Sequence, residues 1–160
     1  MNKRTRYTDS AQGLRARLKP DGDCIIYTGY TDKLGYGKLS AYGKPMLAHR
    51  FAWELEKGPI PDGLYLDHIC HNPSCCKIEH LRLATQKLNM EHQLRAHKNS
   101  SSGIRGVYWN AQREKWQTQV RHNGKAIYCG LFDSLEEAEQ AVIAKRNDLF
   151  TNNDADRVTV

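Results

Sequence analysis

The chain has 160 residues, with 24 Lys and Arg against 18 Asp and Glu, and a formal net charge of +6 at pH 7. This length suffices for one ordinary domain or two small ones, and the basic balance favours a polyanionic partner. No apolar run approaches the roughly 20 residues that a membrane-spanning helix needs, so we expect no membrane partner. The basic start lacks the apolar segment of a signal peptide, and we therefore expect a cytosolic protein.

The N-terminal third of the sequence predicts a basic arm, small hairpins and one helix. Residues 1–20 hold six Lys or Arg against one Asp, a pattern typical of an arm that is either solvated or in contact with phosphates. Short apolar runs between glycines predict strands and hairpins over residues 24–47. Apolar side chains at helical spacing from Ala48 to Lys57, closed by Gly58, predict a short amphipathic helix.

Three soft metal ligands follow one another in the middle of the chain. Cys70, Cys75 and His80 stand at C-x4-C-x4-H spacing, close enough to surround one tetrahedral Zn2+. Because the cytosol keeps thiols reduced, we interpret these cysteines as ligands rather than as part of a disulfide framework. The fourth ligand is open between Cys24 and Cys76. We prefer Cys24, because adjacent cysteines bind one ion only with awkward geometry.

A second set of ligands overlaps the first. Asp67 and Asn89 carry hard oxygens of the kind that Mg2+ prefers, and His68 is an imidazole that can take a proton from water. We expect two strands to flank the loop between His68 and Leu81, which carries the proposed zinc ligands. A helix from Thr85 to about His97 is expected to carry Asn89 back toward Asp67. The remaining histidines of this half are expected to be solvated: His49, His71, His92 and His97.

A family resemblance rests on this stretch. The quoted pattern is Asp67-His68-x-Cys70-x4-Cys75-x4-His80-Leu81-x7-Asn89. It resembles the HNH and His-Cys-box nucleases, whose site is a β-hairpin and helix holding one divalent ion, the ββα-metal fold. Upstream, Cys24-Ile-Ile-Tyr-Thr-Gly29, Gly35-Tyr36-Gly37 and Ala48-His49-Arg50 are similar to the family's lead-in, so that the resemblance covers roughly residues 23–89.

The resemblance implies a Mg2+-dependent DNA endonuclease of the homing type, with His68 as general base and Cys24 as the distant fourth zinc ligand. Such genes are typical of phages and bacteria, which implies the cytoplasm of a bacterium or of a phage-infected host cell. Arg50 is our candidate for neutralising charge on the phosphate. In one departure, Lys77-Ile78 stand where the family usually has Asn-Pro, whose Asn ties the loop together through backbone hydrogen bonds.

The C-terminal part predicts a second domain. Residues 99–103 are small and polar, as in a linker. Three strands are expected over residues 105–109, 115–121 and 126–132, with Asn123-Gly124 as a type I′ turn before the last of them. Ser134-Leu135-Glu136-Glu137 is a capping box that opens a helix.

The predicted fold class is therefore α+β. A zinc-stabilised ββα-metal nuclease domain is followed by a three-stranded antiparallel sheet packed on one helix. The expected limits are a nuclease domain with its basic arm at 1–98, a linker at 99–103, a DNA-binding domain at 104–152 and a tail at 153–160.

The second domain resembles the ethylene-response-factor type of DNA-binding domain, of the APETALA family, over about residues 103–152. The resemblance rests on Arg105-Gly106-Val107, Trp116, Val120-Arg121, Gly130-Leu131-Phe132 and the Glu-Glu-Ala helix. Residues 101–130 carry five bases against one acid and residues 131–160 three against seven, so the sheet would meet the DNA phosphates. The expected DNA-binding residues are Arg105, Tyr108, Arg113, Lys115, Gln117, Gln119 and Arg121. Tyr108 replaces a contacting Arg and Arg113 falls near a contacting Trp, so the target must differ from the plant sites.

We interpret the chain as an endonuclease that hydrolyses duplex DNA at a site read partly by the C-terminal domain. The alternative is a non-catalytic, zinc-containing DNA-binding regulator, although such a scaffold would be free to lose Asp67, His68 and Asn89. A third reading is a nuclease acting on RNA, against which we count the lack of stacking aromatics on exposed strand positions. The target sequence, the choice between nick and double-strand cut, and a homodimer stay open.

Overall fold

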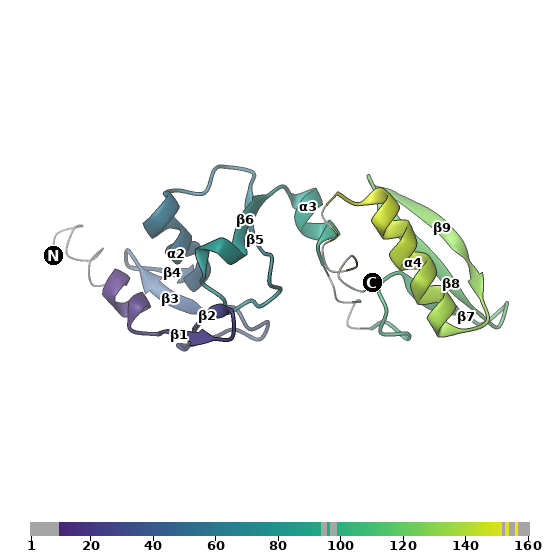
Figure 1. Cartoon of the computed structure of the whole chain (residues 1–160), viewed down its shortest axis with the longest axis horizontal. Helices are drawn as coiled ribbons and strands as arrows, with labels where there is room; N and C mark the ends of the chain where they lie inside the picture. The colour runs from purple at the N-terminus through teal and green to yellow at the C-terminus, as the bar shows by residue number, and fades with distance from the viewer. Residues whose placement is uncertain (1–9, 94–95, 97–98, 152, 154–155, 157–160) are drawn as a thin grey trace. The chain divides into compact units, whose positions relative to one another are not determined.

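The computed structural model describes residues 10–93, 96, 99–151, 153 and 156. The chain divides into two compact units, Met1–Gln86 and Lys87–Val160. Each unit is an α+β arrangement of small antiparallel sheets and short helices (Figure 1). No helix among the residues just given is long and apolar enough to cross a membrane.

The first unit contains three hairpins, a helical segment over residues 10–15 and a longer helix that follows the second hairpin. Its strands pair antiparallel as β1 (Leu18–Asp21) with β2 (Cys24–Tyr27), β3 (Lys38–Ala41) with β4 (Lys44–Leu47), and β5 (Tyr65–His68) with β6 (Leu81–Ala84). The helix α2 (Ala48–Lys57) follows β4 directly and confirms the range predicted from apolar spacing. A short 3-10 turn, η1 (Ile78–His80), leads into β6.

The core of the first unit forms where α2 meets the hairpins. Phe51 and Ala48 of α2 are fully buried against Tyr27 of β2 and Leu14. The Tyr27 ring leaves no room beside it, because a Cβ on Gly37 would lie 2.6 Å from its Cδ1. The apolar stripe of α2 therefore fixes this helix against the hairpins of β2, β3 and β4.

The second unit is a sheet in the order β7-β8-β9 with one covering helix. Its elements are β7 (Val107–Asn110), β8 (Lys115–His122), β9 (Lys125–Phe132) and α4 (Leu135–Leu149). The core between sheet and helix contains Val107, Val120, Ala138, Val142 and Phe150.

Local sequence signals in the second unit are confirmed. Asn123 and Gly124 both have positive φ, at 48° and 77°, as a type I′ turn between β8 and β9 requires. The hydroxyl of Ser134 accepts a hydrogen bond from the backbone N–H of Glu137 at 3.1 Å, which caps α4 as predicted.

The helix expected from Thr85 to about His97 is shorter than predicted. It runs as α3 over Gln86–Glu91, and positions 94–95 and 97–98 lie outside the described residues. The guanidinium of Arg105 donates hydrogen bonds to the carbonyls at the end of α3, at 2.9 Å to Met90 and 3.0 Å to Glu91. A cation on the unpaired last carbonyls stabilises a helix end at this point.

The boundary between the two units falls between residues 86 and 87. The end of α3 and Arg105, which contacts it, therefore both belong to the second unit. The predicted domain limits at 98 and 104 stay a prediction.

Candidate metal centre and active site

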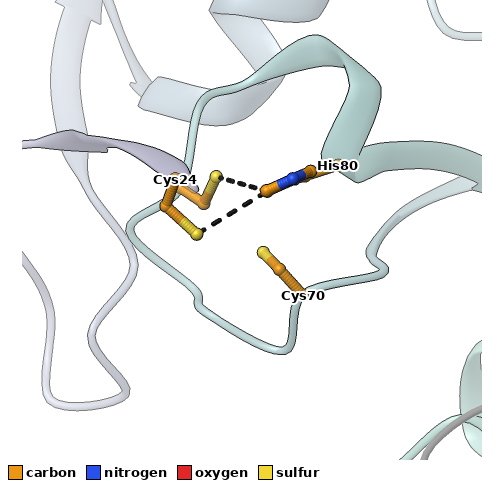
Figure 2. A group of neighbouring side chains, drawn as sticks. Cys24, Cys70 and His80 are labelled. Carbon is orange, nitrogen blue, oxygen red and sulfur yellow. Dashed lines mark hydrogen bonds between the residues drawn. The ribbon is translucent and has the colours of Figure 1, made fainter. Parts of the chain in front are cut away.

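Four metal-ligating side chains converge in the first unit. The ligand atoms of Cys24, Cys70, Cys75 and His80 all lie within 4.8 Å of one another. Figure 2 shows Cys24, Cys70 and His80 pointing toward a common centre. The Nδ1 atom of His80 lies 3.6 Å from the sulfurs of both Cys24 and Cys75. Three thiols and one imidazole at these separations suit a tetrahedral Zn2+.

The electrostatics of the cluster also favour a cation. Burial, followed by the hydrogen bonds to Cys75 and Cys70, raises the pKa of the Cys24 thiol to about 12. Thiols packed so closely resist ionisation unless a cation balances their charge. The donor set therefore fits a soft divalent ion.

Cys24, and not Cys76, completes the cluster. Cys76 is 5% exposed and belongs to the apolar core beside α2. Burial raises the pKa of its thiol to about 12, and its sulfur faces the carbonyl of Ser74 at 3.8 Å. Cys76 therefore behaves as a small apolar residue.

Backbone hydrogen bonds fasten the loop that carries Cys70 and Cys75 to β2. The N–H of Cys76 donates to the carbonyl of Ile25 at 2.7 Å, and the N–H of Tyr27 donates to the carbonyl of Ser74 at 2.9 Å. These two bonds form a small bridge between β2 and the loop. They bring Cys24 to ligands that follow it by more than 40 residues in the sequence.

His68 is held in one tautomer. It ends β5, is 7% exposed, and its Nε2 lies 3.0 Å from the carbonyl oxygen of Cys75. A carbonyl only accepts hydrogen bonds, so Nε2 carries the ring proton and Nδ1 keeps the basic lone pair. Cys75 thus serves twice, because its sulfur belongs to the metal cluster and its carbonyl orients His68.

The charge state of His68 follows from its burial. Desolvation lowers the pKa of His68 below its ordinary value, although the hydrogen bond to Cys75 and the charge of Asp67 act in the other direction. The imidazole is therefore neutral at pH 7. A neutral ring of fixed tautomer can accept a proton from water.

Asp67 has a partner that the sequence interpretation missed. The Nε of Arg82 donates to Oδ2 of Asp67 at 2.9 Å, and the two residues face each other in the register of β5 and β6. The Asp67 side chain is 8% exposed, so the carboxylate is held beside His68. Asn89 falls in the second unit, and its pairing with Asp67 at a Mg2+ ion stays a prediction.

The expectation that His49 is solvated is wrong. His49 is 4% exposed, and its ring lies edge-to-face on His68 with centroids 4.5 Å apart. Tyr36 completes the cluster, with its ring centroid 5.6 Å from that of His49. Burial, with smaller effects of His68 and Arg50, lowers the pKa of His49 to about 3. Its position three residues before Ala52, on the buried stripe of α2, was the available signal.

The other histidines and Arg50 add less to the site. His92 is buried in the second unit at 2% exposure, against expectation, whereas His71 is partly exposed and His97 lies outside the described residues. Arg50 lies on α2, close enough to His49 to influence its pKa. The predicted role of Arg50 at the phosphate stays a prediction.

The strand β8 separates two faces as its alternation predicts. Thr118 and Val120, at 0% and 3% exposure, face α4, whereas Gln119 and Arg121 are exposed on the opposite side. Tyr128 of β9 pairs with Gln119 and is 59% exposed. The expectation that exposed strand positions lack aromatic side chains is therefore wrong.

Four further predicted DNA-binding residues lie on or beside this face. Tyr108 pairs with Gln117 across β7 and β8, and Gln117 accepts a hydrogen bond from Asn110 at 2.6 Å. Lys115 pairs with Asp133 at 3.0 Å, and Arg113 is exposed in the turn before β8. Contact of these four side chains with DNA stays a prediction.

Arg105 is engaged inside the second unit. Its guanidinium binds the carbonyls at the end of α3 and lies 5.4 Å from the centroid of the Phe150 ring. These contacts give Arg105 a structural role. The predicted contact of Arg105 with DNA bases stays a prediction.

Comparison with known proteins adds the family. The HNH endonuclease family model matches residues 46–91, which include His49, Asp67, His68 and three of the four clustered ligands, Cys70, Cys75 and His80. Protein 7.7 of Escherichia phage T7 is 45% identical over 69 residues, which cover 43% of this chain and 53% of that protein. An uncharacterized HNH endonuclease of Acanthamoeba polyphaga mimivirus is 32% identical over 125 residues, covering 78% of this chain and 63% of that protein.

A third relative is covered almost completely. The gene 5.3 protein of Enterobacteria phage T3 is 36% identical over 92 residues, which cover 51% of this chain and 91% of that protein. The chain spans 53% and 63% of the lengths of phage T7 proteins 7.7 and 3.8. No solved structure matches. The chain therefore belongs to the family of the phage T3 gene 5.3 protein and contains an HNH endonuclease domain.

Proposed function

We propose that the chain is a Mg2+-dependent endonuclease of the HNH homing type, which hydrolyses phosphodiester bonds of duplex DNA. The observation that carries this proposal is His68, a buried neutral imidazole whose Nε2 is held by the carbonyl of Cys75 while Nδ1 stays basic. A purely structural zinc loop has no need of such a group beside a buried carboxylate. The HNH family match over the same residues supports it.

In the proposed reaction, Nδ1 of His68 takes the proton of the attacking water. The Cys75 carbonyl and the His49 ring keep the imidazole from turning away. Arg82 holds the carboxylate of Asp67 in place on the neighbouring strand. A positioned general base of this kind contributes about 10²–10⁴-fold to a rate.

Two metal ions belong to the proposal. Cys24, Cys70, Cys75 and His80 would hold Zn2+, which fixes the loop that carries the Cys75 carbonyl. Asp67, with Asn89 as its predicted partner, would hold Mg2+, which stabilises the leaving oxygen when bound. We propose that Arg50 neutralises charge on the phosphate. Its place on α2 near His49 supports this role.

We propose that the second unit reads part of the target site as an ethylene-response-factor-type DNA-binding domain. The exposed side chains of Gln119 and Arg121 on a basic sheet support it, because such donors suit base edges and phosphates. We also propose that the protein acts in the cytoplasm of a phage-infected host cell, since relatives of this chain come from phages T7 and T3.

Supercoiled plasmid tests the proposal directly. Purified protein should convert it to nicked or linear DNA with Mg2+ present, and should leave it intact in EDTA. Single-stranded DNA and RNA of the same sequence serve as competing substrates, which the exposed Tyr128 makes necessary. Tight binding of duplex DNA without cleavage under any divalent ion would instead favour the regulator.

A further inference from the structure

An ion-paired carboxylate, Asp23, adjoins the metal cluster and contacts both Lys77 and His80. Asp23 directly precedes the ligand Cys24, and its Oδ2 lies 3.0 Å from Nε2 of His80. The other carboxylate oxygen, Oδ1, accepts from Nζ of Lys77 at 2.6 Å. Lys77 also donates to the backbone carbonyl of Asp23, at 2.8 Å.

The contact with Asp23 determines which nitrogen of His80 can bind a metal. A carboxylate only accepts hydrogen bonds at neutral pH, so Nε2 of His80 is the protonated nitrogen. Nδ1 then keeps its lone pair and faces the sulfurs of Cys24 and Cys75 at 3.6 Å. A carboxylate behind a ligating histidine fixes its tautomer and ring orientation in this way.

Lys77 fixes Asp23 in position, because it donates one hydrogen bond to the Asp23 carboxylate and one to the Asp23 backbone carbonyl. Both of its acceptors belong to Asp23, so it fixes the start of β2 and the direction of the Asp23 carboxylate. The charged side chain of Lys77 thus reaches across 54 residues of sequence to the strand that carries Cys24.

We propose that Asp23 and Lys77 are positioning residues of the metal centre, which hold His80 in the tautomer that binds the ion. This inference rests on the proposed Zn2+ site. The Asp23 side chain is 83% exposed, so the pair itself adds little to folding stability. Its effect should appear in metal affinity, where loss of such a partner typically costs about 10–100-fold.

Asp23→Asn gives a sharp test, because the amide has one accepting oxygen and one donating nitrogen. If the amide oxygen of Asn faces His80, its NH2 group faces the Lys77 ammonium, and two donors cannot form a hydrogen bond. If the oxygen faces Lys77, the amide nitrogen opposes the Nε2 proton of His80 and favours the tautomer that cannot bind metal through Nδ1. Lys77→Met removes this conflict while keeping an apolar chain of similar length.

Zinc affinity is measured on the full chain by competition with a chelator, with Zn2+ alone as the probe. We expect Asp23→Asn to lose about 10–100-fold and Asp23→Asn/Lys77→Met to bind more tightly than Asp23→Asn alone. Asp21→Asn removes an exposed carboxylate two residues away and should bind as the wild type does. The ring nitrogen signals of His80 in zinc-loaded protein should show a protonated Nε2 and a metal-bound Nδ1.

The outcomes separate this inference from the site on which it rests. If wild-type protein binds no Zn2+, both fail. If it binds one Zn2+ with equal affinity in Asp23→Asn, or if Asp21→Asn loses as much, the positioning role is overturned and the metal site stands. Wild-type Zn2+ affinity in the single variant Lys77→Met would reject Lys77 as the second member of the pair.

Discussion

The choice of the fourth zinc ligand can be tested with two substitutions of identical chemistry. Cys24→Ser removes a sulfur whose neighbours in the cluster lie within 4.8 Å, whereas Cys76→Ser changes a sulfur in the apolar core. Structural Zn2+ sites bind with about 10–16 kcal/mol, which is as large as the whole stability of a typical domain, about 5–15 kcal/mol.

The apolar cluster around α2 in the first unit contains seven buried residues, few enough that loss of Zn2+ should unfold this unit. Cys76→Ser should cost only about 1–3 kcal/mol, the effect of burying a hydroxyl in an apolar site.

Metal analysis and thermal unfolding measure both variants. We expect about one Zn2+ per chain in wild-type protein and in Cys76→Ser, and none in Cys24→Ser. The melting temperature of Cys24→Ser should fall to that of wild-type protein treated with chelator. A folded Cys24→Ser chain that keeps its Zn2+ and its melting temperature would refute the reasoning, as would loss of Zn2+ in Cys76→Ser.

Three further predictions concern recognition, acid stability and the extent of the second unit. Arg121→Ala should relax preference at one base pair by about 1–3 kcal/mol, measured by binding to a library of duplex variants; unchanged preference would remove Arg121 from the reading face. The pKa of His49 lies near 3 in the folded chain and near 6.5 when unfolded, so the unfolded state binds more protons between these values and stability falls as pH drops. In denaturant titrations, His49→Phe should flatten this dependence by up to about 1.4 kcal/mol per pH unit, and parallel curves would contradict the burial argument. A fragment of residues 87–160 should be more stable than one of residues 102–160. The shorter fragment lacks the carbonyls of Met90 and Glu91, and each hydrogen bond that Arg105 donates to them is worth about 1.5–3 kcal/mol. Equal melting temperatures of the two fragments would contradict this contribution of Arg105.

Features set by a few neighbouring residues could be predicted from the sequence. The apolar spacing of Ala48 to Lys57 gave the correct range of α2, and Asn123-Gly124 gave the turn before β9. The hydroxyl of Ser134 caps α4 as its spacing from Glu137 requires. In each case the cause and the structure lie within one or two turns of the chain.

Features set by distant contacts could not be predicted. Asp23 and Lys77 are separated by 54 residues, and only the fold of the loop onto β2 brings them together. The early end of α3 depends on Arg105, which lies 14 residues beyond Glu91. The place of His49 on the apolar stripe of α2 indicates burial, but one imidazole in an amphipathic helix gives no sign that it will meet the ring of His68.

The central claim is that His68 is the base of a metal-dependent DNA cleavage reaction, and one comparison tests it most directly. His68→Gln can keep a donor for the Cys75 carbonyl but offers no basic nitrogen, so it should fold, hold Zn2+ and bind duplex DNA as the wild type does. Single-turnover cleavage of a labelled duplex in Mg2+ at pH 7.5 should be about 10²–10⁴-fold slower than wild type. Because burial lowers the pKa of His68, the wild-type rate should fall only as pH drops below about 6.5. Wild-type cleavage by a folded His68→Gln chain would contradict the assignment.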